Sequence, residues 1–355
     1  MAQLMKPKHP LLQKSLIQLE SLPNLQVEVK AMPFISKSLL ADGQLVLQGS
    51  SHPVEYICEI KPEVSTEDID FIVDYFHQFS KKLDAQQKPL LITQNLSEPI
   101  INRLLDLEIN FIDVNGNTYL NSPGIYILVR RNPQHIPNDG LTNASIKLMY
   151  TLLKRPELLT TSEFDVDLQE ATQIPLDSVI QNLHKLCQLD YLRFRNGKFE
   201  ITDYLKLLER WELGYIENLR PNLFVERYTP VKDQSLVEFS ETLKLHAEVY
   251  GYLIGGEMGA GFATGHLRSP NVTLHIPENN YSVFLKLKLK PDQQGEITLF
   301  NQFGRLNGWD EKLPFLVDPL LIHAELHRSN SDRVKEAAQQ LFEQYIVPRM
   351  IDAGA

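Results

Sequence analysis

Residues 40–61 decide the fold of the first part of this 355-residue chain. They read Leu-Ala-Asp-Gly-Gln-Leu-Val-Leu over 40–47, and Val-Glu-Tyr-Ile-Cys-Glu-Ile-Lys over 54–61, with a Gly-Ser-Ser-His-Pro turn between them. Two alternating strands joined by turn residues predict a β-hairpin. Such a hairpin would bring Asp42, Glu59 and Lys61 to one end of a sheet.

These three residues are candidates for a metal-dependent catalytic site. Two carboxylates, Asp42 and Glu59, offer the hard oxygen ligands that Mg²⁺ prefers. Lys61 beside them could help activate a metal-bound water for attack on a phosphate. The alternative interpretation is that Glu55, Glu59 and Lys61 are solvated residues on an exposed strand face. Mg²⁺ is a cofactor only under the first interpretation, and no cofactor is required otherwise.

The pattern after the hairpin extends this interpretation. Apolar residues at helical spacing run from Ile69 to Phe79, a short apolar strand covers 89–93, and a second helix covers roughly 98–107. Two strands, 110–114 and 118–120, then flank an Asn-Gly turn. The order helix, three strands, helix, strand, helix, strand resembles the core of PD-(D/E)XK restriction-endonuclease-like domains over about 10–130. The proline of that signature is missing, because Ala41 precedes Asp42, so we expect a nuclease-like scaffold with little or no cleavage.

Composition limits the class of protein. A chain of this length is expected to hold two or three domains. It has no apolar run of about 18 residues, which argues against a membrane span, and its first residues lack the pattern of a signal peptide. The two cysteines, Cys58 and Cys187, occupy apolar-pattern positions, which favours reduced core thiols and a cytoplasmic protein. The net charge of −10 argues against non-specific nucleic-acid binding by the whole surface, so DNA binding must rest on a local basic element.

A polar segment at 130–142 with two prolines and a glycine predicts a linker. We therefore expect a multidomain α/β protein. The predicted domains are a restriction-endonuclease-like domain at 1–132, a winged helix-turn-helix at 140–205, and a mixed α/β domain at 210–355.

The winged helix-turn-helix is predicted from three helices and a hairpin. The helices begin near Asn143, Asp167 and Leu176, and Asn196-Gly197 is the turn between strands 191–195 and 198–202. In such domains the third helix enters the major groove and the hairpin contacts the backbone or the minor groove. The DNA-binding candidates are Ser178, Gln181, Asn182 and Lys185 on the helix, with Arg193, Arg195 and Lys198 on the hairpin. The alternative is a protein-binding winged helix, which the acids between Glu163 and Asp177 favour.

The last region is expected to be mixed α/β. Its glycine-rich segment at 255–265 lacks the Gly-Lys-Ser/Thr of a phosphate loop and is expected to follow a helix over 237–252, so close packing explains the glycines better. Residues 271–276 and 282–287 have strand-like patterns. The region loosely resembles nucleotidyltransferase-like folds, but the stretch at 271–273 carries no carboxylates, so such a domain would be catalytically silent. His323 and His327 stand four residues apart, although two histidines alone are more often core or surface residues than metal ligands.

Three blocks carry a wider resemblance, at 111–117 (Phe-Ile-Asp-Val-Asn-Gly-Asn), 255–260 (Gly-Gly-Glu-Met-Gly-Ala) and 318–326 (Asp-Pro-Leu-Leu-Ile-His-Ala-Glu-Leu). With the winged helix between them, the chain resembles AbiEi-like proteins, the transcription-regulating antitoxins of type IV toxin–antitoxin systems, in the longer branch with a nuclease-like N-terminal domain. The resemblance implies a repressor that binds double-stranded DNA at its own operon and has a nucleotidyltransferase-like toxin as partner.

Three interpretations compete. They are a DNA-binding regulator whose other domains serve docking or homodimerisation, a Mg²⁺-dependent DNA endonuclease acting through Asp42, Glu59 and Lys61, and a purely protein-binding antitoxin. Only the second is an enzyme.

Overall fold

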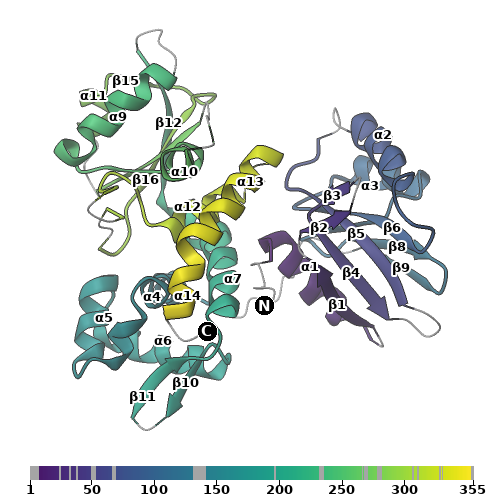
Figure 1. The fold of residues 1–355 in the computed structure, drawn as a ribbon, viewed down its shortest axis with the longest axis horizontal. Coiled ribbons are helices and arrows are strands. Elements are labelled where there is room, and N and C mark those ends of the chain that lie inside the picture. The colour runs from purple at the N-terminus through teal and green to yellow at the C-terminus, as the bar shows by residue number, and fades with distance from the viewer. Residues whose placement is uncertain are drawn as a thin grey trace. The chain divides into compact units, whose positions relative to one another are not determined.

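The computed structural model describes residues 8–23, 25–31, 33–36, 39–48, 53–65, 69–130, 141–195, 197–231, 236–265, 267, 271–277, 282–305, 308–309, 312–327, 329 and 331–352. The chain divides into two compact units, residues 1–139 and 140–355 (Figure 1). The predicted linker falls at this division, and its residues 131–140 lie outside the described part of the chain.

The first unit is built on a seven-stranded mixed sheet. Its strands β5, β6 and β7 are mutually parallel, and the other neighbours are antiparallel. In sheet order the strands are β1 (Gln26–Ala31), β4 (Gly43–Gln48), β5 (Pro53–Lys61), β6 (Gln87–Thr93), β7 (Phe111–Asp113), β8 (Thr118–Ser122) and β9 (Ile125–Val129). The helices are α1 (Pro10–Glu20), α2 (Ile69–Ser80) and α3 (Glu98–Asp106), and β2 (Phe34–Ser36) pairs with β3 (Leu39–Ala41) as a separate ribbon.

The period-two alternation of β5 assigns its side chains to two cores. Tyr56, Cys58 and Ile60 pack with apolar residues of α1 on one face of the sheet. Ile57 packs on the other face with Phe79 of α2. The predicted hairpin is confirmed, because β4 and β5 pair antiparallel from Gly43 opposite Cys58 to Gln48 opposite Pro53. The predicted order helix, three strands, helix, strand, helix, strand matches α1 to β7 for the strands of the seven-stranded sheet, but the β2–β3 ribbon adds two strands between α1 and α2 that were not predicted.

The second unit begins with three helices and a hairpin. These are α4 (Asn143–Lys154), a 3₁₀ turn (Pro156–Thr160), α5 (Phe164–Thr172), α6 (Leu176–Gln188), β10 (Leu192–Arg195) and β11 (Lys198–Ile201). Thr142 caps α4, with its hydroxyl accepting the N–H of Ser145. Gln173 stops α5 in the left-handed conformation, and Pro175 precedes α6, so the two helices are separated by a tight turn. The three predicted helices and the predicted hairpin are present.

The rest of the second unit is a five-stranded sheet with helices. In sheet order the strands are β13 (Leu253–Gly255), β14 (Val272–Ile276), β16 (Ile297–Asn301), β12 (Phe224–Pro230) and β15 (Leu289–Pro291). Among these described strands, β14 and β16 are parallel neighbours and the other pairs are antiparallel. The helices are α7 (Tyr204–Gly214), α8 (Arg220–Leu223), α9 (Leu236–Tyr250), α10 (Gly256–Thr264), α11 (Ser282–Lys286), α12 (Pro319–Leu326), α13 (Asp332–Leu341) and α14 (Val347–Asp352), with π-helical turns at Tyr215–Leu219 and Phe342–Ile346.

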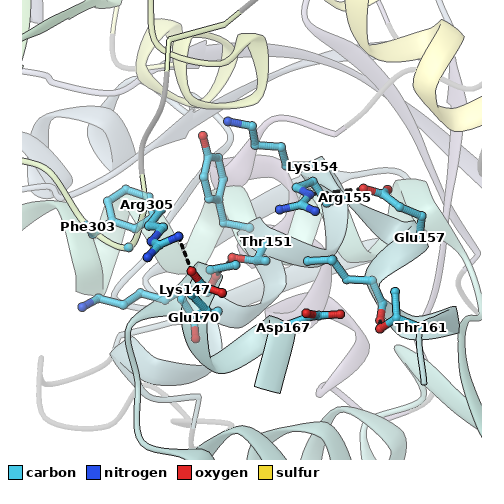
Figure 2. Close-up of a pocket in the computed structure, with 15 residues that line it drawn as sticks. Lys147, Thr151, Lys154, Arg155, Glu157, Thr161, Asp167, Glu170, Phe303 and Arg305 are labelled. Carbon is cyan, nitrogen blue, oxygen red and sulfur yellow. Dashed lines mark hydrogen bonds and ion pairs between the residues drawn. The ribbon is translucent and has the colours of Figure 1, made fainter. Parts of the chain in front are cut away.

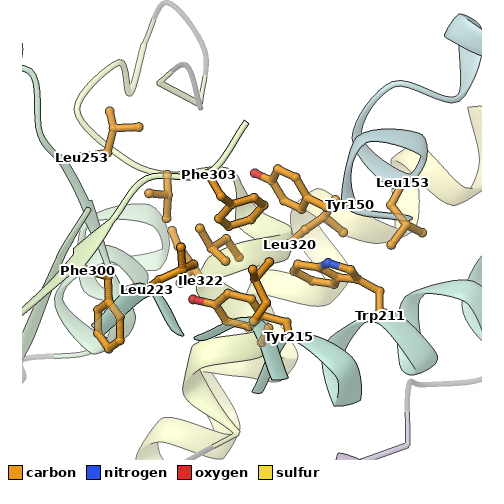
Figure 3. Close-up of a cluster of buried hydrophobic side chains, with 14 of the residues drawn as sticks. Tyr150, Leu153, Trp211, Tyr215, Leu223, Leu253, Phe300, Phe303, Leu320 and Ile322 are labelled. Carbon is orange, nitrogen blue, oxygen red and sulfur yellow. The ribbon is translucent and has the colours of Figure 1, made fainter. Parts of the chain in front are cut away.

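One hydrophobic core joins the three-helix region to this sheet. Tyr150 of α4 packs against Trp211 of α7 and Phe303 beyond β16, with ring centroids 5.3 and 5.2 Å apart (Figure 3). The core cluster includes residues from Leu141 to Met350. The predicted boundary at 205–210 falls inside α7, so the second and third predicted domains share a core.

Two local predictions were wrong. Residues 282–287, expected as a strand, form α11 and the turn after it, with Val283 and Leu287 buried one helical turn apart. The glycine-rich segment follows the short strand β13 and not a helix. The catalytically silent nucleotidyltransferase-like fold stays a prediction. Among the described residues, no helix is long and apolar enough to span a bilayer.

Candidate nucleic-acid interface

The hairpin β10–β11 gathers three cations on one face. Arg193 pairs with Glu200, and Arg195 pairs with Lys198. Because directly paired residues of antiparallel strands share a face, Arg193, Arg195 and Lys198 project from the same side, and all three are exposed. The opposite face anchors the hairpin, since Phe199 is buried and packs against Phe194 at 4.7 Å between ring centroids.

The predicted recognition helix, α6, presents only part of its predicted set to solvent. Gln181 is exposed, and Ser178 and Lys185 are half-buried. Its buried side, formed by Val179, Leu183 and Leu186, belongs to the shared core.

Asn182 has a different position from the one predicted. It is 8% exposed, and its side-chain amide donates to the carbonyl of Ser178 at 2.7 Å. Its Oδ1 accepts from the hydroxyl of Ser145 on α4. Asn182 therefore fixes α6 against α4 and does not belong to the exposed face of α6.

The acids that favoured a protein-binding surface lie mostly on another element. Asp165, Asp167 and Glu170 are on α5, and Glu170 is paired with Arg305. Among the described hairpin residues, the one acid on the basic face is Glu200, opposite Arg193. This face therefore carries three cations and one acid, in a chain whose net charge is −10.

A polar pocket lies between α4, α5 and the loop after β16 (Figure 2). It has a volume of about 350 Å³ and includes Lys147, Lys154, Arg155 and Arg305. Arg155 pairs with Glu157 at 3.2 Å, and Arg305 is neutralised by Glu170. Burial lowers the pKa of Lys154. Sequence reasoning missed this pocket, because residues 303–305 carry no motif and are far along the chain from α4.

In the first unit, the predicted metal residues lie at one end of the β4–β5 hairpin. Oδ2 of Asp42 accepts the N–H of Ile60 at 2.7 Å. Oε1 of Glu59 lies 2.9 Å from Nζ of Lys61, and Glu59 is only 5% exposed. The ammonium of Lys61 also lies 5.5 Å from the ring centroid of Tyr75 on α2. Each carboxylate thus already engages a protein donor, whereas Mg²⁺ needs an octahedral shell with several waters.

A buried polar network joins the glycine-rich block at 255–260 to the block at 318–326. Oε2 of Glu325 on α12 accepts the N–H of Gly256 at 2.7 Å. Its Oε1 lies 3.0 Å from the hydroxyl of Tyr215 and 3.0 Å from Nε2 of His275. Burial raises the pKa of Glu325, but His275 and its other partners outweigh burial and lower it.

Gly255 and Gly256, at the start of α10, both lie where an added Cβ would approach a neighbouring side chain too closely. A Cβ on Gly255 would lie 2.6 Å from Oε2 of Glu325. Gly256 has a φ of +59°, and a Cβ there would lie only 2.7 Å from Oγ1 of Thr273. The glycines that resembled a phosphate loop therefore serve close packing, as the sequence suggested.

A second buried cluster brings Glu212 of α7 to His323 and His327 at the end of α12. Nδ1 of His323 lies 2.5 Å from Oε1 of Glu212, and Nε2 of His327 lies 3.5 Å from Oε2. The spacing of the two histidines was visible in the sequence. The third member was not, because Glu212 precedes His323 by 111 residues.

Comparison with known proteins gives a family match within the second unit. No curated protein matches the chain. Residues 200–347, from the end of β11 into α14, match the family described as transcriptional regulator, AbiEi antitoxin, type IV toxin–antitoxin system. The predicted resemblance is thereby confirmed for this part of the chain, which includes the blocks at 255–260 and 318–326.

Proposed function

We propose that the protein is a DNA-binding transcriptional regulator, the antitoxin and autorepressor of a type IV toxin–antitoxin operon. The observation that carries the proposal is the basic face of β10–β11 beside the exposed side of α6. The helices α4–α6 and this hairpin have the order of a winged helix-turn-helix. They directly precede the region that matches the regulator family.

The proposed contact has two parts. Gln181 of α6 would reach base edges in the major groove, where a glutamine amide suits adenine, with Ser178 and Lys185 beside it. Arg193, Arg195 and Lys198 would contact phosphates, which fixes the register of the protein on the duplex. The acidic remainder of the molecule limits non-specific binding by other surfaces.

The test measures binding to the DNA upstream of the protein's own gene by fluorescence anisotropy at several salt concentrations. In the double variant Arg193→Ala, Arg195→Ala, two phosphate contacts are lost, so the log–log salt slope should fall by roughly 2, at about 0.9 per contact. The matched control is Arg227→Ala, Arg333→Ala, which removes the same charge from exposed positions outside the hairpin. Equal slopes for the hairpin variant and the wild type would contradict the proposal.

Base recognition is tested separately. The Gln181→Ala variant should lose affinity for the operator by about 1–3 kcal/mol while keeping its affinity for a scrambled duplex. An equal loss on both duplexes would mean that Gln181 contacts the backbone and does not read bases.

For the first unit we propose a nuclease-type scaffold that does not cleave DNA. The support is the order of its elements and the state of its carboxylates, because Glu59 is buried against Lys61 and Asp42 is held by the backbone of Ile60. The expected toxin partner is a nucleotidyltransferase-like protein, and co-purification of the two proteins expressed together tests this part of the proposal.

A further inference from the structure

We propose that Glu212, His323 and His327 form a binding site for one divalent transition-metal ion, with Zn²⁺ as the best match. The site is separate from the DNA contact, and its proposed role is to cross-link α7 to α12. It goes beyond transcriptional regulation, and it stands or falls independently of DNA binding.

The geometry of the three side chains is the first support. His323 and His327 are one helical turn apart, with ring centroids separated by 4.8 Å. One ligand atom from each of the three residues lies within 4.8 Å of the others. A tetrahedral site with bonds of about 2.0–2.1 Å places its ligand atoms roughly 3.3 Å apart. The contacts of 2.5 and 3.5 Å and the upper limit of 4.8 Å bracket this value, so side-chain shifts of about one ångström would centre a metal.

The chemistry of the donor set is the second support. A carboxylate with two imidazoles is a common ligand set for Zn²⁺ that keeps a fourth position for water. Glu212 is fully buried, and the described group nearest its Oε2 is Nε2 of His327 at 3.5 Å, which is too long for a good hydrogen bond. A buried carboxylate oxygen without a hydrogen bond is costly, and coordination to a cation would satisfy it.

Access is provided by one edge of the cluster. The side chain of His327 is 12% exposed, whereas those of Glu212 and His323 are 0% and 3% exposed. A metal would enter beside His327 and become enclosed between the two helices. The competing arrangement is a metal-free triad, in which hydrogen bonds between the two imidazoles and the carboxylate hold the three side chains together.

The experiment uses the full-length protein after dialysis against a chelator. Co²⁺ is titrated in, and its visible absorption reports both stoichiometry and tetrahedral geometry. Zn²⁺ is then added to displace Co²⁺. We expect one equivalent of Co²⁺ with a tetrahedral spectrum, full displacement by Zn²⁺, and a higher melting temperature of the second unit in the presence of Zn²⁺, because a ligand that binds only the folded state stabilises it.

His327→Gln is the main variant, because it removes a ligand at the partly exposed edge and leaves the buried carboxylate in place. It should weaken Co²⁺ binding by at least tenfold and abolish the tetrahedral spectrum, while circular dichroism confirms that it folds. His246→Gln on α9 is the matched control and should bind as the wild type does. Absence of a stoichiometric Co²⁺ spectrum in the wild type, or an unchanged spectrum in His327→Gln, would overturn the proposal in favour of the metal-free triad.

Discussion

Replacing Glu325 by alanine should destabilise the second unit strongly. Its side chain is only 2% exposed, and its carboxylate lies among the N–H of Gly256, the hydroxyl of Tyr215 and the imidazole of His275. Each buried donor left without an acceptor costs about 1–3 kcal/mol, and the three costs are not additive. With three buried partners affected, we take about 3–5 kcal/mol as the expected loss in the free energy of unfolding.

The assay is thermal unfolding followed by calorimetry. For domains of 150–250 residues each kcal/mol shifts the melting temperature by about 2–4 °C, so the Glu325→Ala transition of the second unit should fall by roughly 6–20 °C. The transition of the first unit should not move, because its core is separate. The matched control is Glu336→Ala on the exposed side of α13, which should change stability by no more than about 0.5 kcal/mol.

A conservative variant separates charge from shape. In Glu325→Gln, the amide oxygen can still accept from the N–H of Gly256, and the NH₂ can donate to the hydroxyl oxygen of Tyr215. Its expected cost is therefore smaller, about 1–2 kcal/mol. If Glu325→Ala melted within 2 °C of the wild type, where roughly 6–20 °C is expected, the carboxylate would not hold α12 to the start of α10, and the stabilising role assigned to it here would be refuted.

Three further outcomes are expected. Gly256→Ala should cost at least about 2 kcal/mol, because its Cβ would approach Thr273 Oγ1 to 2.7 Å, whereas Gly197→Ala, with open space around a φ of +78°, should cost only about 1–2 kcal/mol in the same melting assay. Asp113→Asn should destabilise the first unit by about 1–3 kcal/mol in urea, since an amide NH₂ would face backbone N–H donors. Burial raises the pKa of Asp113 above its ordinary 3.8. The protonated side chain therefore stabilises the folded first unit below pH 3.8, and this stabilisation is lost as pH rises through the raised pKa. The difference in the free energy of unfolding between the wild type and Asp113→Asn should consequently narrow toward neutral pH. Supercoiled plasmid incubated with the protein and Mg²⁺ should stay intact, and nicking that disappears in Glu59→Gln would contradict the non-cleaving scaffold.

Local patterns in the sequence predicted most of the elements. The β4–β5 hairpin follows from period-two alternation around a turn, and α6 follows from helical spacing of Val179, Leu183 and Leu186. The failure at 282–287 has a clear cause. As a strand, Val283, Leu285 and Leu287 would share one face, but Leu285 is 68% exposed while the other two are buried. A short apolar run fits both periods, and tertiary packing decided between them.

The buried clusters could not be predicted in the same way. Glu212 meets His323, and His275 meets Glu325, across 111 and 50 residues of chain. No periodicity links residues so far apart, and a buried glutamate looks like a surface glutamate in a sequence. Asn182 shows the converse, since a polar residue next to the exposed side of α6 is turned inward by one hydroxyl on α4.

The position of α7 limits how any signal could pass through the second unit. This helix lies in the core shared by the three-helix region and the five-stranded sheet, so these parts are packed together and do not swing freely against each other. A protein that docks on the five-stranded sheet would therefore not easily tilt α6 away from a bound duplex, because α6 and the sheet share one core. Its practical means of influence would be steric: covering the approach to the hairpin, or lending extra surface that holds the complex on the DNA longer. If the proposed DNA contact holds, derepression by such a partner would depend on its bulk and its stoichiometry, and not on a change of shape transmitted through the second unit.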